Sequence, residues 1–413
     1  FMLRRLYLNK LEMYVDRNVV KIITGVRRSG KTTLIRQFIE ELRESNIPDE
    51  RIFYVNFEGV LYSYFNKSSD LRDMMLSFVE SVNGEHCYIF LDELQCVEGW
   101  DEVIAEMLNL CDCDIYVSSS NASLLRGDFA KKLDYRYVKI DVYPLTFSEY
   151  LEMTAGEPGH YAEEGSEQLS RKELFDDYLR RGFMPGAYTG CTADNEEFIR
   201  DYLRNVYNTI LLKDVVQCNK LRDISHLDKI MEYILSHTGE TFSPKSLRDH
   251  VKAQGVTISV DTVYSFLDAL TGSYLIRKVP RYDIKADREL ETHEKYYICD
   301  TAMRNAVMGD EGASYESMIE TALCLELLAR GFKLYVGKNN QSQIDFMGVK
   351  GDDRTYLNCC ATVDDKDVAK KKFGSLVRIR DNYFKMVLST DPETRINKGG
   401  IINYPITEFM AQG

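Results

Sequence analysis

The sequence predicts an α/β protein in which a parallel sheet with helices on its faces is followed by a helical and winged-helix region and an α/β carboxyl-terminal domain. Short apolar runs that alternate with helix-period segments predict the parallel sheet. A glycine-containing octapeptide at residues 25–32 stands between a β-branched run and a helix-period run, which predicts a tight loop at the end of the first strand.

The composition limits the class of protein. The 413 residues suffice for two or three domains that each bury a core, and the formal charge of −13 argues against a globally basic nucleic-acid-binding protein. The ten cysteines include no C-x-x-C pair, so we expect no zinc site. No apolar run approaches a membrane span and the amino terminus lacks a signal-peptide pattern, so we expect a cytoplasmic protein without membrane contact.

The octapeptide fits G-x-x-x-x-G-K-[ST], the phosphate-binding loop. Gly25 and Gly30 permit a loop whose amide groups encircle phosphates, and the next helix turns its positive dipole end toward them. Lys31 is expected to reach the β- and γ-phosphates of ATP, and Thr32 to bind Mg²⁺. The alternative is a chance match in a surface loop, which the strand-loop-helix context disfavours. The residues expected to bind the nucleotide are Gly25, Val26, Arg27, Arg28, Ser29, Gly30, Lys31, Thr32 and Thr33.

The run from Cys87 to Leu91 is apolar and too short for a helix, and Asp92 and Glu93 follow it directly. A buried parallel strand delivers such acids to its carboxyl end, as in the Walker B pattern. Asp92 is expected to hold Mg²⁺ through water, and Glu93 to polarise the attacking water. The alternative is an ordinary buried strand that ends in a solvated acidic turn.

A fourth strand, residues 114–118, runs into a cluster of short polar side chains. Ser120 and Asn121 are candidates for a γ-phosphate sensor, and the alternative is a helix N-cap for residues 122–125. Arg126 and Arg136 are candidates for an arginine finger that acts in cis or across a subunit contact; a surface ion pair is the alternative for each.

These segments together resemble one family. The residues that carry the resemblance are Gly25–Thr32, Leu91–Gln95 with Trp100, Ser118–Asn121 and Tyr143–Tyr150. They are similar to AAA-superfamily ATP-binding proteins of bacteria and archaea that carry the domain DUF4143 at their carboxyl end. The resemblance implies a P-loop, RecA/AAA-like sheet followed by helical and winged-helix segments. Ser119 departs from the Gly of the family's Thr-Gly-Ser-Asn pattern.

Four domains are expected in chain order. They are a P-loop ATPase domain at 1–152, a helical lid at 168–222, a winged helix at 223–290 and a nuclease-like domain at 291–413. In the winged helix, the second helix of a helix-turn-helix carries Asp261 and Asp268 but no Lys or Arg, and the wing alone is basic, with Arg277, Lys278 and Arg281. Protein contact or domain packing is therefore favoured over sequence-specific DNA binding.

The segment after residue 291 has the helix-strand order of a restriction-endonuclease core. Glu320 and Asp345 fill the positions of two metal-binding acids, whereas Asn358 and Cys360 stand where an acid and a lysine are needed. An inactive scaffold is therefore expected. The alternative is that both acids are unrelated surface residues.

The sequence as a whole indicates a Mg²⁺-dependent, ATP-hydrolysing switch whose carboxyl-terminal domains engage an unidentified protein partner. The residues expected to act in catalysis are Lys31, Glu93, Asn121 and Arg136, and those expected to bind the metal are Thr32 and Asp92. Two other functions stay open. One is a DNA-associated ATPase that binds nucleic acid weakly, and the other is a nucleotide-gated scaffold that scarcely hydrolyses ATP. An oligomer is compatible with each.

Overall fold

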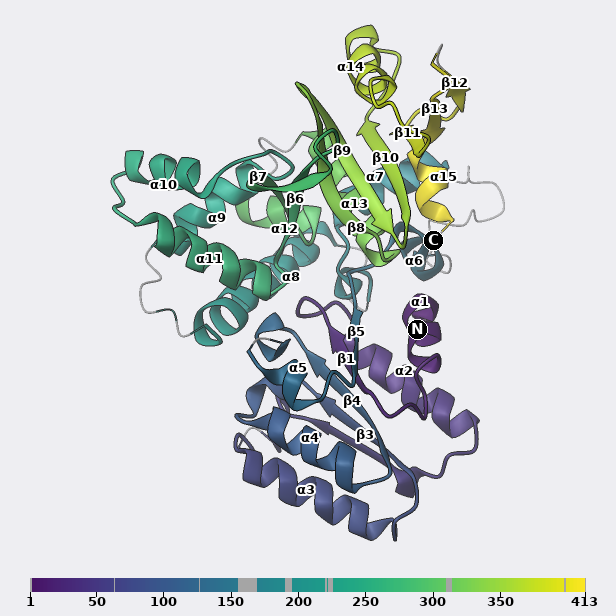
Figure 1. Cartoon of the computed structure of the whole chain (residues 1–413), viewed down its shortest axis with the longest axis vertical. Helices are drawn as coiled ribbons and strands as arrows, with labels where there is room; N and C mark the ends of the chain where they lie inside the picture. The colour runs from purple at the N-terminus through teal and green to yellow at the C-terminus, as the bar shows by residue number, and fades with distance from the viewer. Residues whose placement is uncertain are drawn as a thin grey trace. The chain divides into compact units, whose positions relative to one another are not determined.

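The computed structural model describes residues 2–62, 64–125, 127–154, 169–189, 195–219, 221, 226–309, 314–396 and 399–412. The chain forms two compact units (Figure 1). Unit 1 comprises Phe1–Val142 and Gly272–Tyr274, and unit 2 comprises Tyr143–Thr271 and Leu275–Gly413. No helix among the described residues is both long enough and apolar enough to cross a membrane.

Unit 1 is a parallel sheet of five strands in the order β2-β3-β4-β1-β5. The strands are β1 (Val20–Thr24), β2 (Ile52–Asn56), β3 (Cys87–Asp92), β4 (Cys113–Ser119) and β5 (Tyr137–Asp141). The helices are α1 (Arg5–Glu12), α2 (Lys31–Glu44), α3 (Ser68–Ser81), α4 (Trp100–Leu110) and α5 (Phe129–Lys132). The parallel sheet predicted for the first domain is therefore present.

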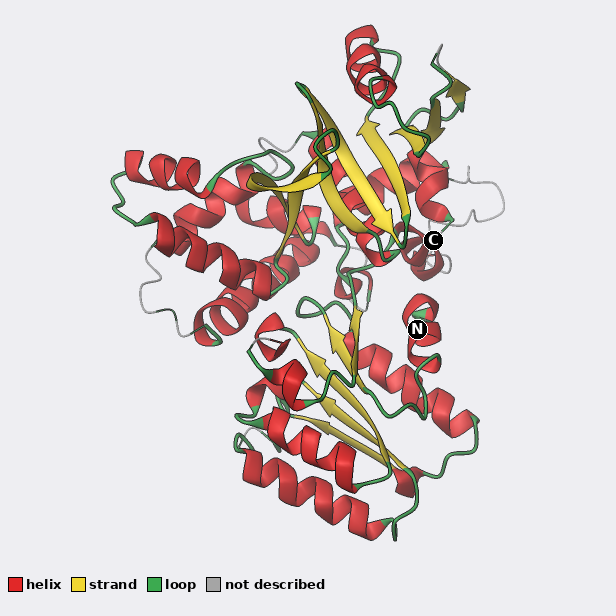
Figure 2. Cartoon of the chain, in the orientation of Figure 1, coloured by secondary structure: helices red, strands yellow, loops and turns green. Residues whose placement is uncertain are grey.

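Helices cover both faces of this sheet, giving three layers (Figure 2). The side chains of a strand alternate between the faces, so Ile22 packs with α3, α4 and α5, whereas its neighbour Ile23 packs with α1 and α2. Both β1 and β3 are buried along their whole length. Burial on two faces explains why these strands read as continuous apolar runs in the sequence.

Gly25 joins β1 to the loop at a point where a side chain cannot fit. Its φ is +152°, and a Cβ built there would lie 2.1 Å from the carbonyl oxygen of Val142. That oxygen belongs to backbone, which cannot move aside as a flexible side chain can. The chain therefore requires glycine at this position for its close approach as well as for its dihedral angle.

Unit 2 combines helices with a mixed sheet. The helices after Val142 are α6 (Phe147–Thr154), α7 (Arg171–Arg181), α8 (Glu196–Thr209), α9 (Leu227–Ser236), α10 (Pro244–Ala253), α11 (Val260–Gly272), α12 (Thr301–Met308), α13 (Tyr315–Ala329), α14 (Lys366–Val377) and α15 (Ile406–Ala411), with a π-helical segment at Ile210–Gln217. The segment predicted as a lid lies in unit 2, where the Arg204 guanidinium of α8 donates to the Ala306 carbonyl of α12 at 2.7 Å.

The sheet of unit 2 has eight strands in the order β12-β13-β11-β10-β9-β8-β6-β7. They are β6 (Ile276–Asp283), β7 (Arg288–Ile298), β8 (Lys333–Asn339), β9 (Ser342–Lys350), β10 (Asp353–Cys360), β11 (Phe384–Ser389), β12 (Arg395–Ile396) and β13 (Ile402–Pro405). Neighbouring pairs are antiparallel at β6/β7, β8/β9, β9/β10 and β12/β13, and parallel at β6/β8, β10/β11 and β11/β13.

This sheet corrects the expected boundary between a winged helix and a nuclease-like domain at residue 290. That position lies inside β7, and β6, which contains most of the predicted wing, pairs with β7 on one side and with β8 on the other. The helix pair α10 and α11 is present as expected, but the strands after it are part of the carboxyl-terminal sheet. Sequence patterns detect a hairpin without revealing which sheet it joins.

Asp300 ties two distant segments of unit 2 together. Its carboxylate caps α12 by accepting from the Met303 amide at 2.8 Å, and it also accepts from the amides of Phe183 and Met184 at 2.6 and 2.9 Å. Burial raises the pKa of this carboxyl to about 6, although the backbone hydrogen bonds oppose the rise. One fully buried side chain thus holds the turn after α7 against the start of α12.

We predict that Gly25→Ala destabilises unit 1 by about 3 kcal/mol or more, because strain and overpacking act together. Gly84→Ala is the matched control, since its φ is +76° but nothing lies within 4 Å of the added Cβ. This control should lose only about 1 kcal/mol. Urea unfolding followed by the fluorescence of Trp100, the only tryptophan, reports on unit 1. Equal losses for the two variants would contradict the prediction.

Candidate functional site

The loop after β1 is shaped to leave amide groups open at the start of α2. Arg28 and Gly30 have φ values of +70° and +98°, and the first turn of α2 has no side-chain cap. Such a helix end carries unsatisfied N–H groups and positive dipole charge. Within the described part of the chain, the buried Ser29 hydroxyl also has no hydrogen-bond partner. Both features fit a phosphate ligand.

Lys31 is buried and directed back over the loop. Its Nζ donates to the carbonyls of Gly25 and Val26 at 3.0 and 3.2 Å and lies 3.5 Å from Glu93 Oε1. A buried ammonium needs anionic or carbonyl partners, and here loop oxygens and one carboxylate supply them. Lys31, the residue predicted to bind phosphate, thus lies at the loop and is paired with Glu93, the predicted base.

The two predicted metal ligands lie in contact. Thr32 Oγ1 donates to Asp92 Oδ2 at 2.7 Å. Tyr54 and Asn56 of β2 donate to the same oxygen at 3.1 and 3.0 Å, and the Ser118 hydroxyl of β4 donates to Oδ1. Mg²⁺ prefers oxygen ligands such as hydroxyl and carboxylate oxygens, so Thr32 and Asp92 fit the ion. Burial and the neighbouring Glu93 raise the pKa of Asp92, whereas the Ser118 and Thr32 hydrogen bonds oppose the rise.

Glu93 follows β3 in a left-handed conformation, with φ of 58°. Its Oε2 accepts from Gln95 Nε2 at 2.5 Å and from the Ser120 amide at 3.2 Å, while Oε1 faces Lys31. Burial alone would raise the pKa of Glu93, but the Lys31 ammonium and the Gln95 hydrogen bond lower it to about 2. The carboxylate is therefore ionised and held at the edge of the loop.

The polar cluster after β4 lies beside these acids. Ser118 contacts both of them, because its hydroxyl binds Asp92 and accepts from the Glu93 amide at 2.9 Å. Asn121 is fully buried, and its backbone amide donates to Ser119 Oγ at 3.0 Å. The sensor role of Ser120 and Asn121 stays a prediction. Sequence reasoning placed the cluster correctly but did not single out Ser118.

Other predicted loop residues take different positions. Arg27 forms a two-pronged ion pair with Glu58, with Nη1–Oε2 and Nη2–Oε1 distances of 2.5 and 2.7 Å. Its side chain thus anchors the loop to the segment after β2. Thr33 is exposed on α2. The guanidinium of Arg4, the buried residue just before α1, donates to the Ser29 carbonyl at 2.7 Å.

Sequence reasoning missed the groups that support the acids, Tyr54, Asn56 and Gln95, and those that hold the loop, Arg4 and Glu58. A signal for two of them was present, because Asn56 ends and Glu58 closely follows an aromatic and β-branched run, and parallel strands deliver such residues to the carboxyl edge of a sheet. Arg4 had no such signal, since its contact depends on how α1 packs.

The structure corrects the prediction that Arg136 acts in cis, on a nucleotide bound by the loop of its own chain. The carbonyl of Arg136 accepts from the amide of Val20, the first residue of β1, whereas the loop follows the last residue of β1. Five residues of parallel strand separate these ends. The guanidinium donates to Asn109 Oδ1 at 2.7 Å. An action of Arg136 in cis is therefore wrong, and one across subunits stays a prediction; Arg126 lies outside the described residues.

The predicted basic wing is engaged within unit 2. The Arg277 guanidinium lies 4.7 Å from the ring centroid of Tyr143, and Lys278 Nζ is 3.3 Å from Glu294 Oε1. Arg281 is only half-exposed on β6. These partners reduce the charge that the wing offers to phosphates.

The two acids singled out in the carboxyl-terminal segment, Glu320 and Asp345, lie close together. Glu320 on α13, Asp345 on β9 and Cys359 on β10 place their ligand atoms within 4.8 Å of one another, a spacing that suits a metal ion. Two ammonium groups already contact the carboxylates: Lys295 of β7 lies 2.5 Å from Glu320 Oε1, and Lys372 of α14 lies 2.5 Å from Asp345 Oδ2. Neither lysine was expected from the sequence.

The charges of this cluster are paired with one another. Burial would raise the pKa of Asp345, but Lys372 and Lys295 lower it; burial would lower the pKa of each lysine, but the carboxylates raise both. The acids and ammonium groups thus neutralise one another, and a divalent cation would have to displace a lysine. Asn358, at the predicted acid position, accepts from the Asp345 amide at 2.9 Å and so supports the strands.

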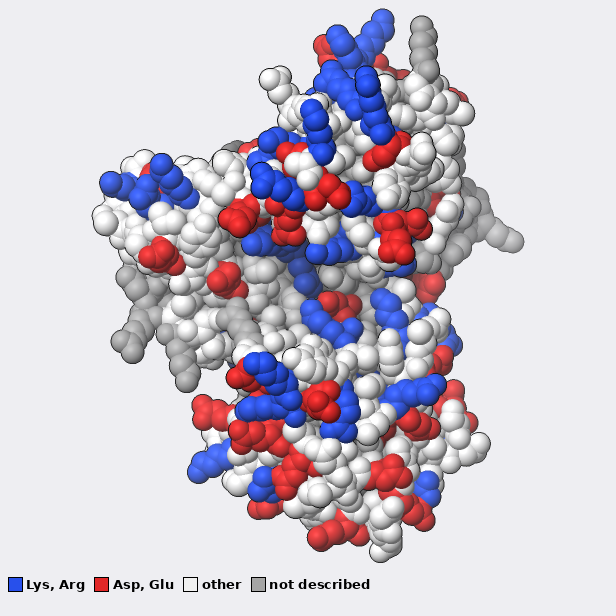
Figure 3. All heavy atoms as spheres, in the orientation of Figure 1, with Lys and Arg blue, Asp and Glu red and all other residues white. Residues whose placement is uncertain are grey.

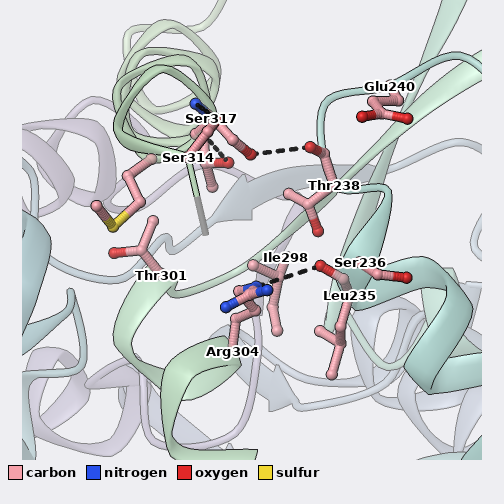
Figure 4. Close-up of a pocket in the computed structure, with 11 residues that line it drawn as sticks. Leu235, Ser236, Thr238, Glu240, Ile298, Thr301, Arg304, Ser314 and Ser317 are labelled. Atoms are coloured by element: carbon pink, nitrogen blue, oxygen red, sulfur yellow. Dashed lines mark hydrogen bonds between the residues drawn. The ribbon is translucent and has the colours of Figure 1, made fainter. Parts of the chain in front are cut away.

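Unit 2 also contains a polar cavity of about 110 Å³ (Figure 4). Arg304 reaches into it from α12, and Ser317 at the start of α13 donates to the Thr238 carbonyl at 2.9 Å. The cavity has room for several waters but is far smaller than the roughly 300–1,000 Å³ of small-molecule sites. It therefore does not compete with the loop of unit 1 as a nucleotide site.

Comparison with known proteins agrees with this geometry. A family model described as an AAA domain matches residues 17–151. An uncharacterized protein of Haemophilus influenzae is 30% identical over 409 residues, covering 99% of this chain and 98% of its own length. The chain belongs to one family with that protein, and its first domain matches the AAA domain model.

Other similarities extend over most of the chain. The uncharacterized protein MJ1544 of Methanocaldococcus jannaschii is 24% identical over 357 residues, covering 85% of this chain and 76% of its own. The Walker-type ATPase PABY2304 of Pyrococcus abyssi has a TM-score of 0.52 at 15% identity, covering 75% of this chain and 96% of that one, and shows the fold alone. The model that matches residues 172–314 is a domain of unknown function, DUF8612; the expected DUF4143 is not shown.

Substitutions should separate the roles of the AAA site residues. We predict that Lys31→Ala loses ATP affinity, because its ammonium meets phosphate charge in ground and transition states alike. Glu93→Gln should bind ATP but hydrolyse it at least about a hundredfold more slowly. Asp92→Ala should lose both activity and its Mg²⁺ dependence. Calorimetric ATP affinity and phosphate release at fixed Mg²⁺ measure these effects. Unchanged ATP binding by Lys31→Ala would refute the loop assignment, and parental hydrolysis by Glu93→Gln would refute its role as the base.

Proposed function

We propose that the protein is a Mg²⁺-dependent ATPase whose nucleotide state governs the engagement of a protein partner by unit 2. The convergence of Lys31, Thr32, Asp92 and Glu93 at the carboxyl edge of one parallel sheet carries this proposal. Having a base as well as metal ligands favours hydrolysis over binding alone. The buried cysteines Cys87, Cys299 and Cys324 are free thiols, which is compatible with a cytoplasmic setting.

ATP binding changes the partner of one ammonium group. The loop amides bind the phosphates, and Lys31 exchanges the Gly25 and Val26 carbonyls and Glu93 for phosphate oxygens. Glu93 then loses the cation that lowers its pKa, so its basicity rises while a γ-phosphate is in place. The base is thus weak without substrate and stronger with it.

Thr32 and Asp92 would hold the Mg²⁺ ion, which supplies positive charge to neutralise the phosphates. Glu93 accepts a proton from the water that attacks the γ-phosphorus. Loss of phosphate removes the charge that attracted Lys31, which allows the ammonium to return to Glu93. The arrangement of the loop therefore differs between the ATP and product states, as a switch requires.

We predict that partner engagement follows the nucleotide. The Glu93→Gln chain, purified from its native cell with ATP, should retain a co-eluting protein at least about tenfold more than with ADP, because it stays in the ATP state. Lys31→Ala should give equal amounts with either nucleotide. Quantitative mass spectrometry of the eluates is the measurement. Equal recovery by Glu93→Gln in ATP and ADP would exclude the switch.

A second function, nucleic-acid binding, is favoured by one surface. Lys and Arg side chains gather at the top of the view over α14 (Figure 3). The exposed basic residues of this segment are Lys366, Lys370, Lys371, Arg378 and Arg380. Acids at 364, 365 and 367 lie beside them and reduce the field. Because the whole chain carries −13, this surface supports weak phosphate contact rather than sequence-specific binding.

We predict salt-sensitive duplex DNA binding, weaker than micromolar at physiological salt, and no cleavage. Lys370→Ala with Lys371→Ala should weaken the binding in fluorescence anisotropy, and the dependence on salt should become shallower. Mg²⁺ or Mn²⁺ should not support nicking, because Lys295 and Lys372 occupy the cation positions. Submicromolar, sequence-selective binding would overturn the first expectation. Plasmid nicking that Asp345→Ala abolishes would overturn the second.

A further inference from the structure

Gln95 joins the predicted base to the sensor cluster. It lies in the 3₁₀ turn Leu94–Cys96, directly after the left-handed residue Glu93. Its Nε2 donates to Glu93 Oε2 at 2.5 Å and is 3.1 Å from Ser120 Oγ. Leu94 is fully buried and anchors the turn. The amide is therefore held between the acid that follows β3 and the hydroxyl that follows β4.

The orientation of this amide follows from its neighbour. The Glu93 carboxylate faces the Lys31 ammonium at 3.5 Å and accepts from the Ser120 backbone amide at 3.2 Å, and a carboxylate oxygen paired in this way only accepts hydrogen bonds. The NH₂ group must therefore face Glu93, which leaves Gln95 Oε1 on the other branch. In the described part of the chain, Oε1 is buried and has no hydrogen-bond partner.

A buried acceptor without a partner costs free energy, and such atoms in native structures call for an explanation. Replacing the amide by an apolar side chain of similar size would remove this cost. Gln95 Oε1 belongs to a side chain that contacts the predicted base directly, so it is placed to accept from a small donor molecule that enters the site during the reaction. Water is that donor in ATP hydrolysis.

We infer that Gln95 is a water-positioning residue of the ATPase proposed above, and that its Oε1 accepts one O–H of the attacking water while Glu93 accepts the other. With both hydrogens directed, a lone pair of the water faces the γ-phosphorus. The new P–O bond forms as the bond from that phosphorus to the β–γ bridging oxygen breaks, with its electron pair leaving on ADP. The proton passes to Glu93, so water and ATP give ADP and phosphate.

The test is Gln95→Leu, which removes both amide groups at nearly constant volume. Phosphate release should fall roughly tenfold to hundredfold, because a misplaced reactant costs about that much, while the ATP affinity measured by calorimetry stays unchanged. The acid limb of the pH–rate profile should move to higher pH, since loss of the Gln95 hydrogen bond raises the pKa of Glu93. Gln343→Leu, on an exposed strand residue, is the control and should match the parent.

Two further variants secure the interpretation. Gln95→Asn keeps the amide but shortens its reach, and it should lose activity similarly if the leucine variant does not fold. In a Glu93→Gln background, Gln95→Leu should cost less than about twofold, because both residues act on the same water. Independent, multiplicative losses would overturn the inference.

Other results would also overturn it. Parental hydrolysis by Gln95→Leu would mean that the amide does not position water, and faster hydrolysis would make it an inhibitory latch. A fall in ATP affinity without a shift of the acid limb would make it merely structural. If the parent chain itself releases no phosphate from ATP, the proposed function and this inference fall together, which separates that failure from the others.

Discussion

The carboxylate of Asp92 is the contact on which the candidate site depends. It accepts hydrogen bonds from Thr32 after β1, from Asn56 at the end of β2 and from Ser118 on β4. Because β3 lies between β2 and β4, and β4 separates it from β1, one side chain links the ends of four parallel strands. Removing the carboxylate would leave several buried donors without a partner and would loosen the loop as well as the metal site.

In the proposed ATPase, nucleotide binding and hydrolysis are linked through a single ammonium group. Lys31 contacts both its own loop and Glu93, so the ligand that draws it away also changes the charge around the base. The coupling requires no movement of the sheet. It depends on a buried environment in which each cation must have an oxygen partner, and therefore exchanges one partner for another rather than losing it.

The two units contain carboxylates in opposite electrostatic states. Asp92 is surrounded by neutral hydroxyl and amide donors, so its negative charge stays available to a cation, and its pKa is raised. Asp345 is neutralised by Lys372 and supported by Lys295, and its pKa is lowered. An acid with neutral donors is open to a metal ion, whereas an acid paired with lysine is occupied. The same residue type thus lies in the candidate metal site of unit 1 and in a charge-paired cluster of unit 2.

The sequence by itself determined the parallel sheet of unit 1, the phosphate-binding loop and the acids after β3, because these depend on periodicity and on residues adjacent along the chain. Tertiary structure decided the rest. It placed Arg136 at the opposite edge from the loop, joined the expected wing to the carboxyl-terminal sheet, and brought Lys372 to Asp345 from a different element. Local patterns carry no information on which distant strands pair, so the pairing of β6 with β8 and the charge balance of unit 2 became visible only in the folded chain.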